Sequence, residues 1–302
     1  MKNDWRGVFP ALTTQFRKDL SLDLEATQRH IEVMIASGST GIVLLGSLGE
    51  NVTLDRSEKR RVMRAALEAA AGRVPVLSGV AENSTSAAVT YTRELERLGA
   101  DGLLLLPAMI YKADPRETLT HYRTVARATG LPVICYNNPL AYHVDITPAM
   151  FAELAAVRNL IGIKESSGDL RRMTDIQNLV GERYRLFAGI DDLLLESAML
   201  GAVGWIAGLN LAFPREGQRL WDLTQRGDWA AARKLYRWFM PLMHLDTHLK
   251  FVQYIKLAVQ EAGYGKEWVR PPRLTITGPE RQGVLKIIRK GIATRPVGGR
   301  RK

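Results

Sequence analysis

A lysine that follows an apolar run is the residue of this sequence best suited to chemistry. Lys164 comes directly after 160–163 and precedes the polar, glycine-containing turn 165–169, a pattern typical of a buried strand that leads into a loop. Desolvation at a strand end disfavours the ammonium form. We therefore expect the pKa of Lys164 to fall toward the range where a neutral amine attacks ketones. The alternative is a lysine whose stem packs in the wall while its head reaches water or pairs with Glu165.

Tyr136 ends the preceding apolar run, 131–136. If the two runs form neighbouring parallel strands, about 4.8 Å apart, the phenol and the amine can meet. A tyrosine hydroxyl beside a lysine amine is suited to passing protons during imine formation, and to protonating or deprotonating the carbon next to the imine. The alternative for Tyr136 is an amphipathic ring that packs with its hydroxyl in water.

A third candidate is the turn 46–49, Gly-Ser-Leu-Gly, which follows another apolar run. Its hydroxyl, Ser47, and its backbone N–H groups can hold a carboxylate. A plain strand-to-helix turn is the alternative. The sequence contains neither a G-x-x-x-x-G-K-[ST] phosphate loop nor a G-x-G-x-x-G motif, so no nucleotide cofactor is expected.

Eight apolar runs, each followed by a helical pattern, must position these residues. Such alternation predicts a parallel sheet covered by helices, and eight units that close on themselves form a (β/α)8 TIM barrel, with a doubly wound open sheet as the alternative. In a barrel the active site lies at the carboxyl ends of the strands. The predicted strands are 8–12, 41–45, 74–79, 102–106, 132–136, 160–164, 184–188 and 203–207, and the last helix of the barrel begins near Pro214.

Three further helical patterns follow the barrel, at 229–240, 250–262 and 279–291. We therefore divide the chain into a catalytic barrel (1–225), C-terminal helices packed on the barrel (226–292) and a basic flexible tail (293–302).

Composition excludes several classes of protein. The apolar fraction of 46% and charged fraction of 24% in 302 residues are those of an ordinary globular protein. The absence of a long apolar run and of a signal peptide predicts a cytoplasmic protein without a membrane partner. The single cysteine, Cys135, is expected to be a buried hydrophobe. The net charge of +11 is spread over helices and the tail and has no nucleic-acid motif beside it, so no nucleic-acid partner is expected.

The best candidate for a metal site is His244-Leu245-Asp246-Thr247-His248, with histidines at helical i, i+4 spacing. It falls in the C-terminal extension, which we expect to lie away from every strand end, and no glutamate stands in an H-E-x-x-H arrangement. We predict no metal here and an interfacial or capping role for the histidines.

Three motifs together resemble the dihydrodipicolinate synthase and N-acetylneuraminate lyase family: Gly46-Ser47-Leu48-Gly49-Glu50, Tyr136-Asn137-Asn138-Pro139, and Gly162-Ile163-Lys164-Glu165-Ser166-Ser167-Gly168. The likeness covers most of the chain. It implies a class I, Schiff-base (β/α)8 enzyme that acts on a small 2-oxo acid without cofactor or metal. It also implies a homotetramer built from two tight dimers.

The resemblance also implies roles for single residues. Lys164 matches the imine-forming lysine, Tyr136 the acid/base tyrosine and Ser47 a proton-relay hydroxyl. The positions expected to contact or border the substrate are Gly46, Leu48, Gly49, Asn138, Gly189 and Ile206.

Three departures from the family pattern bear on the substrate. Leu48 stands where many members have a second hydroxyl. Ala108-Met109 stands where synthases insert a tyrosine from a neighbouring subunit. The sequence does not decide whether Tyr111 replaces that tyrosine. The segment 140–143 lacks the arginine that holds the second substrate of synthases.

These departures disfavour a lysine-pathway synthase. Residues 46–51, 107–115 and 136–139 together look most like the branch of hydroxyproline breakdown that deaminates the cyclic imine 1-pyrroline-4-hydroxy-2-carboxylate. The alternatives are a pyruvate-type aldolase, a 4-hydroxy-tetrahydrodipicolinate synthase, and a non-enzymatic barrel that senses a ligand or binds polyanions.

Overall fold

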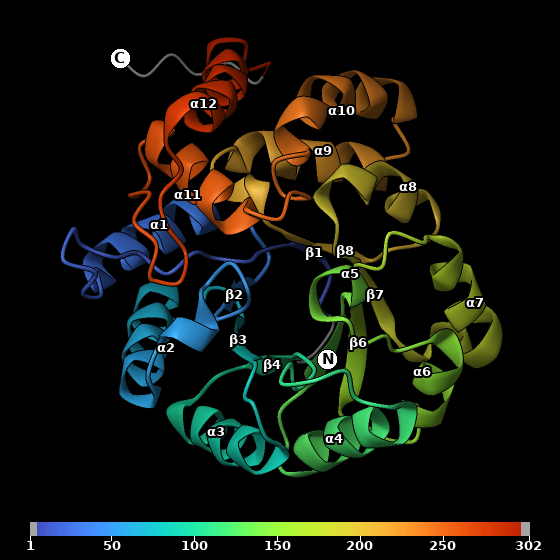
Figure 1. The fold of residues 1–302 in the computed structure, drawn as a ribbon. Helices are drawn as coiled ribbons and strands as arrows, with labels where there is room; N and C mark the ends of the chain where they lie inside the picture. The colour runs from blue at the N-terminus through green and yellow to red at the C-terminus, as the bar shows by residue number, and fades with distance from the viewer. Residues whose placement is uncertain (1–4, 297–302) are drawn as a thin grey trace.

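A ring of parallel strands lies at the centre of the molecule, with helices around it (Figure 1). The computed structural model describes residues 5–296, within which eight strands pair in the order β1-β8-β7-β6-β5-β4-β3-β2. A bridge between Ala11 and Val43 joins the first two strands and closes the ring. The predicted (β/α)8 barrel is therefore confirmed. The strands are β1 Gly7–Pro10, β2 Ile42–Leu44, β3 Val76–Val80, β4 Gly102–Leu105, β5 Val133–Asn137, β6 Leu160–Glu165, β7 Arg185–Ala188 and β8 Gly204–Ala207.

The outer helices begin where the sequence provides caps. Asp55 and Asp114 each accept a hydrogen bond from the backbone N–H of the third helical residue and complete capping boxes, which satisfies N–H groups that a helix leaves free. Thr147 caps its helix by accepting the backbone N–H of Met150. These helices are α1 Leu24–Ala36, α2 Arg56–Ala70, α3 Thr85–Leu98, α4 Pro115–Arg127, α6 Pro148–Leu154, α7 Arg171–Val180, α8 Leu194–Met199 and α9 Pro214–Gln225.

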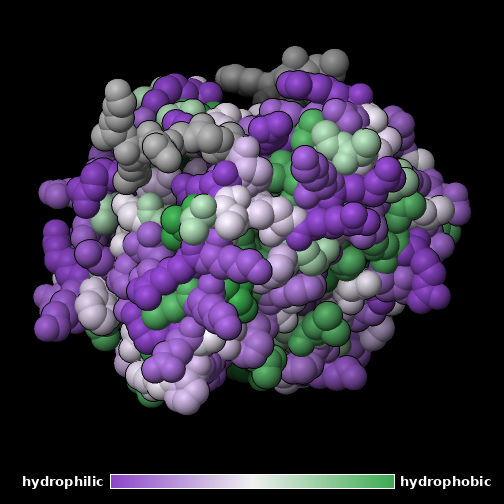
Figure 2. Space-filling model, turned by 90° about the horizontal axis from the view of Figure 1, so that it is seen from above, coloured by the Kyte–Doolittle hydropathy of each residue, from purple (hydrophilic) through white to green (hydrophobic). Residues whose placement is uncertain are grey.

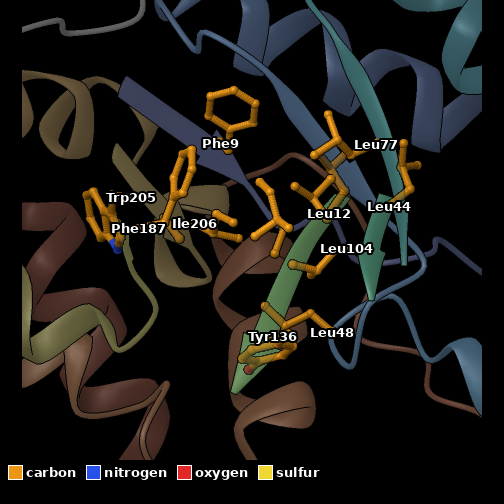
Figure 3. Close-up of a cluster of buried hydrophobic side chains, with 14 of the residues drawn as sticks. Phe9, Leu12, Leu44, Leu48, Leu77, Leu104, Tyr136, Phe187, Trp205 and Ile206 are labelled. Carbon is orange, nitrogen blue, oxygen red and sulfur yellow. The ribbon is translucent and has the colours of Figure 1, made fainter. Parts of the chain in front are cut away.

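Apolar side chains fill the inside of the barrel (Figure 3). Phe9 and Phe187 meet edge to face with ring centroids 5.5 Å apart, and Leu12 and Leu104 lie toward the middle of the cluster. Tyr136 and Leu48 lie side by side at the opposite end from Phe9. Because the interior is packed, chemistry is confined to the carboxyl ends of the strands, where Tyr136 is.

Three helices extend the barrel, as expected: α10 Trp229–Met243, α11 Phe251–Glu261 and α12 Gly278–Ala293. In Figure 1 they stack beside α9 and α1. Arg295, within the segment expected to be a flexible tail, donates to the carbonyl of Ala212. The rest of that tail, 297–302, lies outside the described residues, and the boundaries at 225 and 292 stay predictions.

A buried ion pair joins the extension to the barrel. Lys256 Nζ of α11 lies 2.7 Å from Glu50 Oε1, and both side chains are fully buried. The second carboxylate oxygen of Glu50 accepts the backbone N–H of Arg270. Burial lowers the pKa of Lys256 to about 8, and Glu50 opposes this fall. The extension therefore holds the end of the turn that carries Ser47.

The surface drawn in Figure 2 is largely polar, and its apolar residues lie in separate groups. No helix within 5–296 is long and apolar enough to cross a membrane. Cys135 is buried, as expected, and burial raises the pKa of its thiol.

Lys256→Met should lower the free energy of unfolding by about 3–5 kcal/mol, because it leaves the Glu50 carboxylate buried without its cation. The double variant Lys256→Met/Glu50→Gln should recover part of this loss, since no charge then remains buried. Urea unfolding followed by circular dichroism measures both. A single variant that unfolds at the wild-type urea concentration would show that the pair does not anchor the extension.

Candidate active site

Lys164 and Tyr136 face each other across two adjacent strands. They are register partners in β6 and β5, and the Lys164 amine lies 4.2 Å from the centre of the Tyr136 ring. Their side chains are only 7% and 6% exposed. An ammonium over an aromatic face is a favourable contact, so the packing holds the amine near the phenol at the carboxyl end of the barrel.

Glu165, the alternative partner of Lys164, is held elsewhere. Its carboxylate accepts the N–H of Ser167 at 2.7 Å and the side-chain amide of Asn137 at 3.2 Å. Burial raises the pKa of Glu165, and these hydrogen bonds oppose the rise. No hydrogen bond or ion pair between Lys164 and Glu165 is found in the described part of the chain, so the amine is not neutralised by its neighbour in sequence.

The turn that carries Ser47 is held from several sides. Leu45 and Glu50, which flank it, have φ angles of 56° and 52°. Residues other than glycine rarely adopt this left-handed backbone conformation. Thr14 donates to the carbonyl of Gly49 at 2.7 Å and Asn51 to that of Leu45 at 2.7 Å. The surrounding contacts thus impose a strained turn at a candidate site, which is where such strain tends to occur.

A short helix, α5 Pro139–Tyr142, follows the Tyr136 motif and was not predicted. Asn138 caps it by accepting the N–H of Ala141, and its amide donates to the Tyr136 hydroxyl at 3.2 Å. The helix presents Tyr142, whose hydroxyl hydrogen-bonds to Ser47 Oγ. The sequence signal was an asparagine followed by proline, a pair typical of a helix start.

Two carboxyl groups, of the buried Asp191 and the half-buried Asp246, lie near enough to the amine to interact with its charge. Asp191 accepts the indole N–H of Trp205 at 2.9 Å and the backbone N–H of Leu209 at 2.7 Å. Asp246 lies against β8, since a methyl group on Gly208 would be 2.3 Å from its Oδ1. Burial raises the pKa of both carboxyls, and the nearby Lys164 opposes the rise. Repulsion from Asp191 pushes the pKa of Asp246 further, well above its usual range.

A cavity of about 430 Å³ joins these groups. Of the predicted site residues, Lys164, Tyr136, Ser47, Gly46, Leu48, Asn138 and Gly189 line it. Gly49 and Ile206 are not among the lining residues in the described structure: Gly49 packs within its turn and Ile206 points into the barrel core (Figure 3).

Sequence reasoning missed several lining residues, namely Tyr142, Ser166, Asp246 and Arg273. The Ser166 hydroxyl is buried and has no hydrogen-bond partner among residues 5–296. It borders the cavity, where a ligand can satisfy it. Ser166 lay inside the lysine motif, and Asp246 inside the segment considered as a metal site. The places of Tyr142, Asp246 and Arg273 in the cavity depend on the short helix α5 and on the extension, whose paths the pattern of apolar residues does not define.

One expectation about the extension was wrong. Asp246, Thr247 and His248 line the cavity beside Lys164, because the segment between α10 and α11 folds over the mouth of the barrel. The two histidines do not converge: His244 pairs with Asp192 at 2.7 Å, and His248 stacks on Tyr254. No group of residues suited to a metal is found between residues 5 and 296.

Tyr111 lies elsewhere. It is 58% exposed and lines a separate cavity with His121 and Arg116. Within this chain the tyrosine that joins Tyr136 and Ser47 is Tyr142.

Gly189, at the end of β7, leaves room for the lysine. A methyl group there would lie 2.1 Å from Ser166 Oγ and 2.9 Å from Lys164 Cγ. Gly189→Ala should therefore displace the Lys164 side chain and slow its borohydride-trapped adduct with pyruvate about 100-fold, the usual cost of misplacing a reacting group.

The control is Gly283→Ala in α12, where an added methyl group meets no heavy atom within 4 Å; its adduct should form at the wild-type rate. Intact-protein mass spectrometry measures both variants. Equal rates for Gly189→Ala and the wild type would contradict the steric role of Gly189.

Comparison with known proteins agrees with this geometry. The chain is 36% identical over 241 residues to a 4-hydroxy-tetrahydrodipicolinate synthase of Methanospirillum hungatei, covering 79% of this chain and 82% of the relative. It is 32% identical over 290 residues to the enzyme of that name from Methanosarcina barkeri, covering 95% and 98%. The structure of a chloride-inhibited dihydrodipicolinate synthase from Acinetobacter baumannii in complex with pyruvate matches with a TM-score of 0.91 and 26% identity, over 95% of this chain and 98% of that one. The model of the dihydrodipicolinate synthetase family matches residues 4–291, and the chain belongs to this family of class I lyases.

Proposed function

We propose that this protein forms a Schiff base between Lys164 and a small 2-oxo acid, or the cyclic imine of one. The observation that carries the proposal is the buried Lys164 amine packed 4.2 Å from the Tyr136 ring in a cavity. Family membership favours an enzyme over the ligand-sensing or polyanion-binding alternative. The pyruvate complex of a structural neighbour supports a 2-oxo acid as ligand.

The relatives and the site favour different substrates. The relatives' names favour 4-hydroxy-tetrahydrodipicolinate synthase, and Arg273 on the cavity wall offers a guanidinium to a second carboxylate. Leu48 and the side chains of α5 instead place apolar groups and a phenol in the cavity. Asp246 adds a carboxyl group there.

We infer from the cavity residues that the substrate is 1-pyrroline-4-hydroxy-2-carboxylate. A carboxyl with a raised pKa, such as that of Asp246, is protonated more readily than an ordinary one. In its protonated form it repels a second substrate carboxylate less than an ionised carboxyl does, and it can donate a proton to a leaving hydroxyl. The deaminase reaction requires a hydroxyl to leave from C4. In the synthase reaction the second substrate instead carries a carboxylate, and no hydroxyl has to leave beside Asp246.

The reaction begins when Lys164 Nζ attacks C2 of the ring. The bond from C2 to the ring nitrogen breaks, and that nitrogen leaves as a free amine on C5. Loss of a proton from C3 gives an enamine, with Tyr136 and Ser47 carrying the proton. The enamine expels the C4 hydroxyl as water. C5 and its amine then each lose a proton while C3 and C4 each take one up, which gives an imine at C5, and hydrolysis of both imines releases ammonia, 2-oxoglutarate semialdehyde and the lysine. One water is released and two are consumed.

The test is to incubate the protein with this cyclic imine, and separately with pyruvate and aspartate semialdehyde, and to follow ammonia release and pyruvate consumption. We expect ammonia from the cyclic imine and loss of that activity in Lys164→Ala. Lys59→Met, which removes a buried lysine paired with Glu82 outside the cavity, should keep it. Pyruvate consumption without ammonia release would instead establish the synthase reaction, and activity in Lys164→Ala would exclude the imine.

Asp246→Asn should lower ammonia release about 100-fold, the usual contribution of a general acid. In the wild type the rate should fall as the pH rises through the raised pKa of Asp246, because the carboxyl then loses the proton it donates. The asparagine variant should lack this fall.

Asp175→Asn, at an exposed position on α7, is the control and should keep the wild-type rate and profile. An Asp246→Asn profile that matches the wild type would contradict the donor role.

A further inference from the structure

Tyr142 stands out because its side chain contacts both halves of the proposed site. It hydrogen-bonds to Ser47 Oγ on the β2 side, and its ring meets that of Tyr136 edge to face, with centroids 5.5 Å apart and planes at 89°. It lines the same cavity as Lys164. The roles already proposed for Lys164, Tyr136 and Ser47 give the Tyr142 hydroxyl no part in the reaction.

We propose that Tyr142 is the third member of a hydroxyl relay, Tyr136–Tyr142–Ser47, which one chain completes by itself and which carries the C3 proton between substrate and solvent. The inference rests on the proposed imine at Lys164. It adds that the relay needs no residue from another subunit.

The position of Tyr142 is built into the chain. Asn138 both caps α5 and donates to the Tyr136 hydroxyl, so one side chain sets the helix and the acid/base tyrosine together. The Ser47 turn is held independently by Thr14, Asn51 and the Glu50–Lys256 pair. The Tyr142–Ser47 hydrogen bond therefore joins two rigid elements.

The proton on Tyr142 is available for transfer and is not lost to solvent. Burial raises the pKa of Tyr142 well above its ordinary value, and the neighbouring Tyr136 adds to the rise while the Ser47 hydrogen bond opposes it. The group therefore stays a neutral hydroxyl that both donates and accepts a hydrogen bond, as a relay member must.

The step can be written for pyruvate bound to Lys164. The C3–H bond breaks and its electron pair forms the C2=C3 bond, while the C2=N pair moves onto the iminium nitrogen. The proton passes to one hydroxyl oxygen as that hydroxyl hands its own proton along the relay to water at the cavity mouth. The reverse returns a solvent proton to C3, so in D₂O the methyl group of pyruvate becomes deuterated.

The experiment measures two properties of the same protein. Loss of the pyruvate methyl signal in D₂O, followed by proton NMR, gives the C3 exchange rate, and borohydride trapping with mass spectrometry gives the amount of Lys164 adduct. Tyr142→Phe should slow exchange about 100-fold and keep the adduct within about twofold, since imine formation retains Lys164 and Tyr136. Tyr184→Phe, at a tyrosine outside the cavity whose hydroxyl donates to the carbonyl of Phe151, is the matched control and should change neither.

Ser47→Ala tests the relay from its other end. It should slow exchange about as much as Tyr142→Phe, and the double variant should be no slower than either single variant, because residues that act as a unit are not additive. If the double variant slowed exchange by the product of the two single-variant factors, the relay would be overturned.

Other outcomes separate the two proposals. Exchange at the wild-type rate in Tyr142→Phe, or equal losses of exchange and adduct, would overturn the relay alone. A wild-type protein that forms no adduct would overturn the imine itself.

Discussion

The site depends on one packing constraint: a lysine amine is held against the face of a tyrosine ring on the adjacent strand. The parallel register of β5 and β6 makes Tyr136 and Lys164 partners, and the filled barrel interior leaves the amine only the carboxyl end to face. Gly189 keeps the next strand clear of the lysine stem. Neither Asn137 nor Glu165 competes for the amine, because these two side chains bind each other.

The remaining groups are brought to this pair by elements outside the barrel strands. The extension acts twice: Lys256 holds Glu50 at the end of the Ser47 turn, and the segment before α11 places Asp246 in the cavity. The short helix α5 adds Tyr142. The result is an amine with hydroxyl groups on one side and carboxyl groups on the other, an arrangement suited to moving protons around an imine.

Much of this arrangement could be predicted from the sequence, and the reasons are local. Each barrel strand is an apolar run followed by a helical pattern, and several of these helices have a capping side chain. The order of the strands and the positions of Lys164 and Tyr136 therefore follow from hydrophobic periodicity and from helix-start signals. Ser47 follows in the same way from its turn. Gly189 was predicted from the resemblance, and the structure adds the physical reason, which is room for the Lys164 stem.

What could not be predicted depends on contacts between distant segments. Asp246 lies between two predicted helices, and only the fold shows that its segment closes over the barrel mouth. Tyr142 belongs to the short helix α5, which was not predicted. Its partner Ser47 is 95 positions away in sequence, a distance over which apolar periodicity carries no information. The identity of the substrate could not be predicted for the same reason, since it depends on how α5 and the extension shape one cavity.

The most direct test of the account is a crystal structure of the protein soaked in pyruvate. The account predicts continuous electron density from Lys164 Nζ to C2 of the ligand, with its methyl group facing the hydroxyls of Tyr136, Tyr142 and Ser47. Pyruvate bound without a covalent bond to Lys164, or an adduct on another lysine, would contradict it.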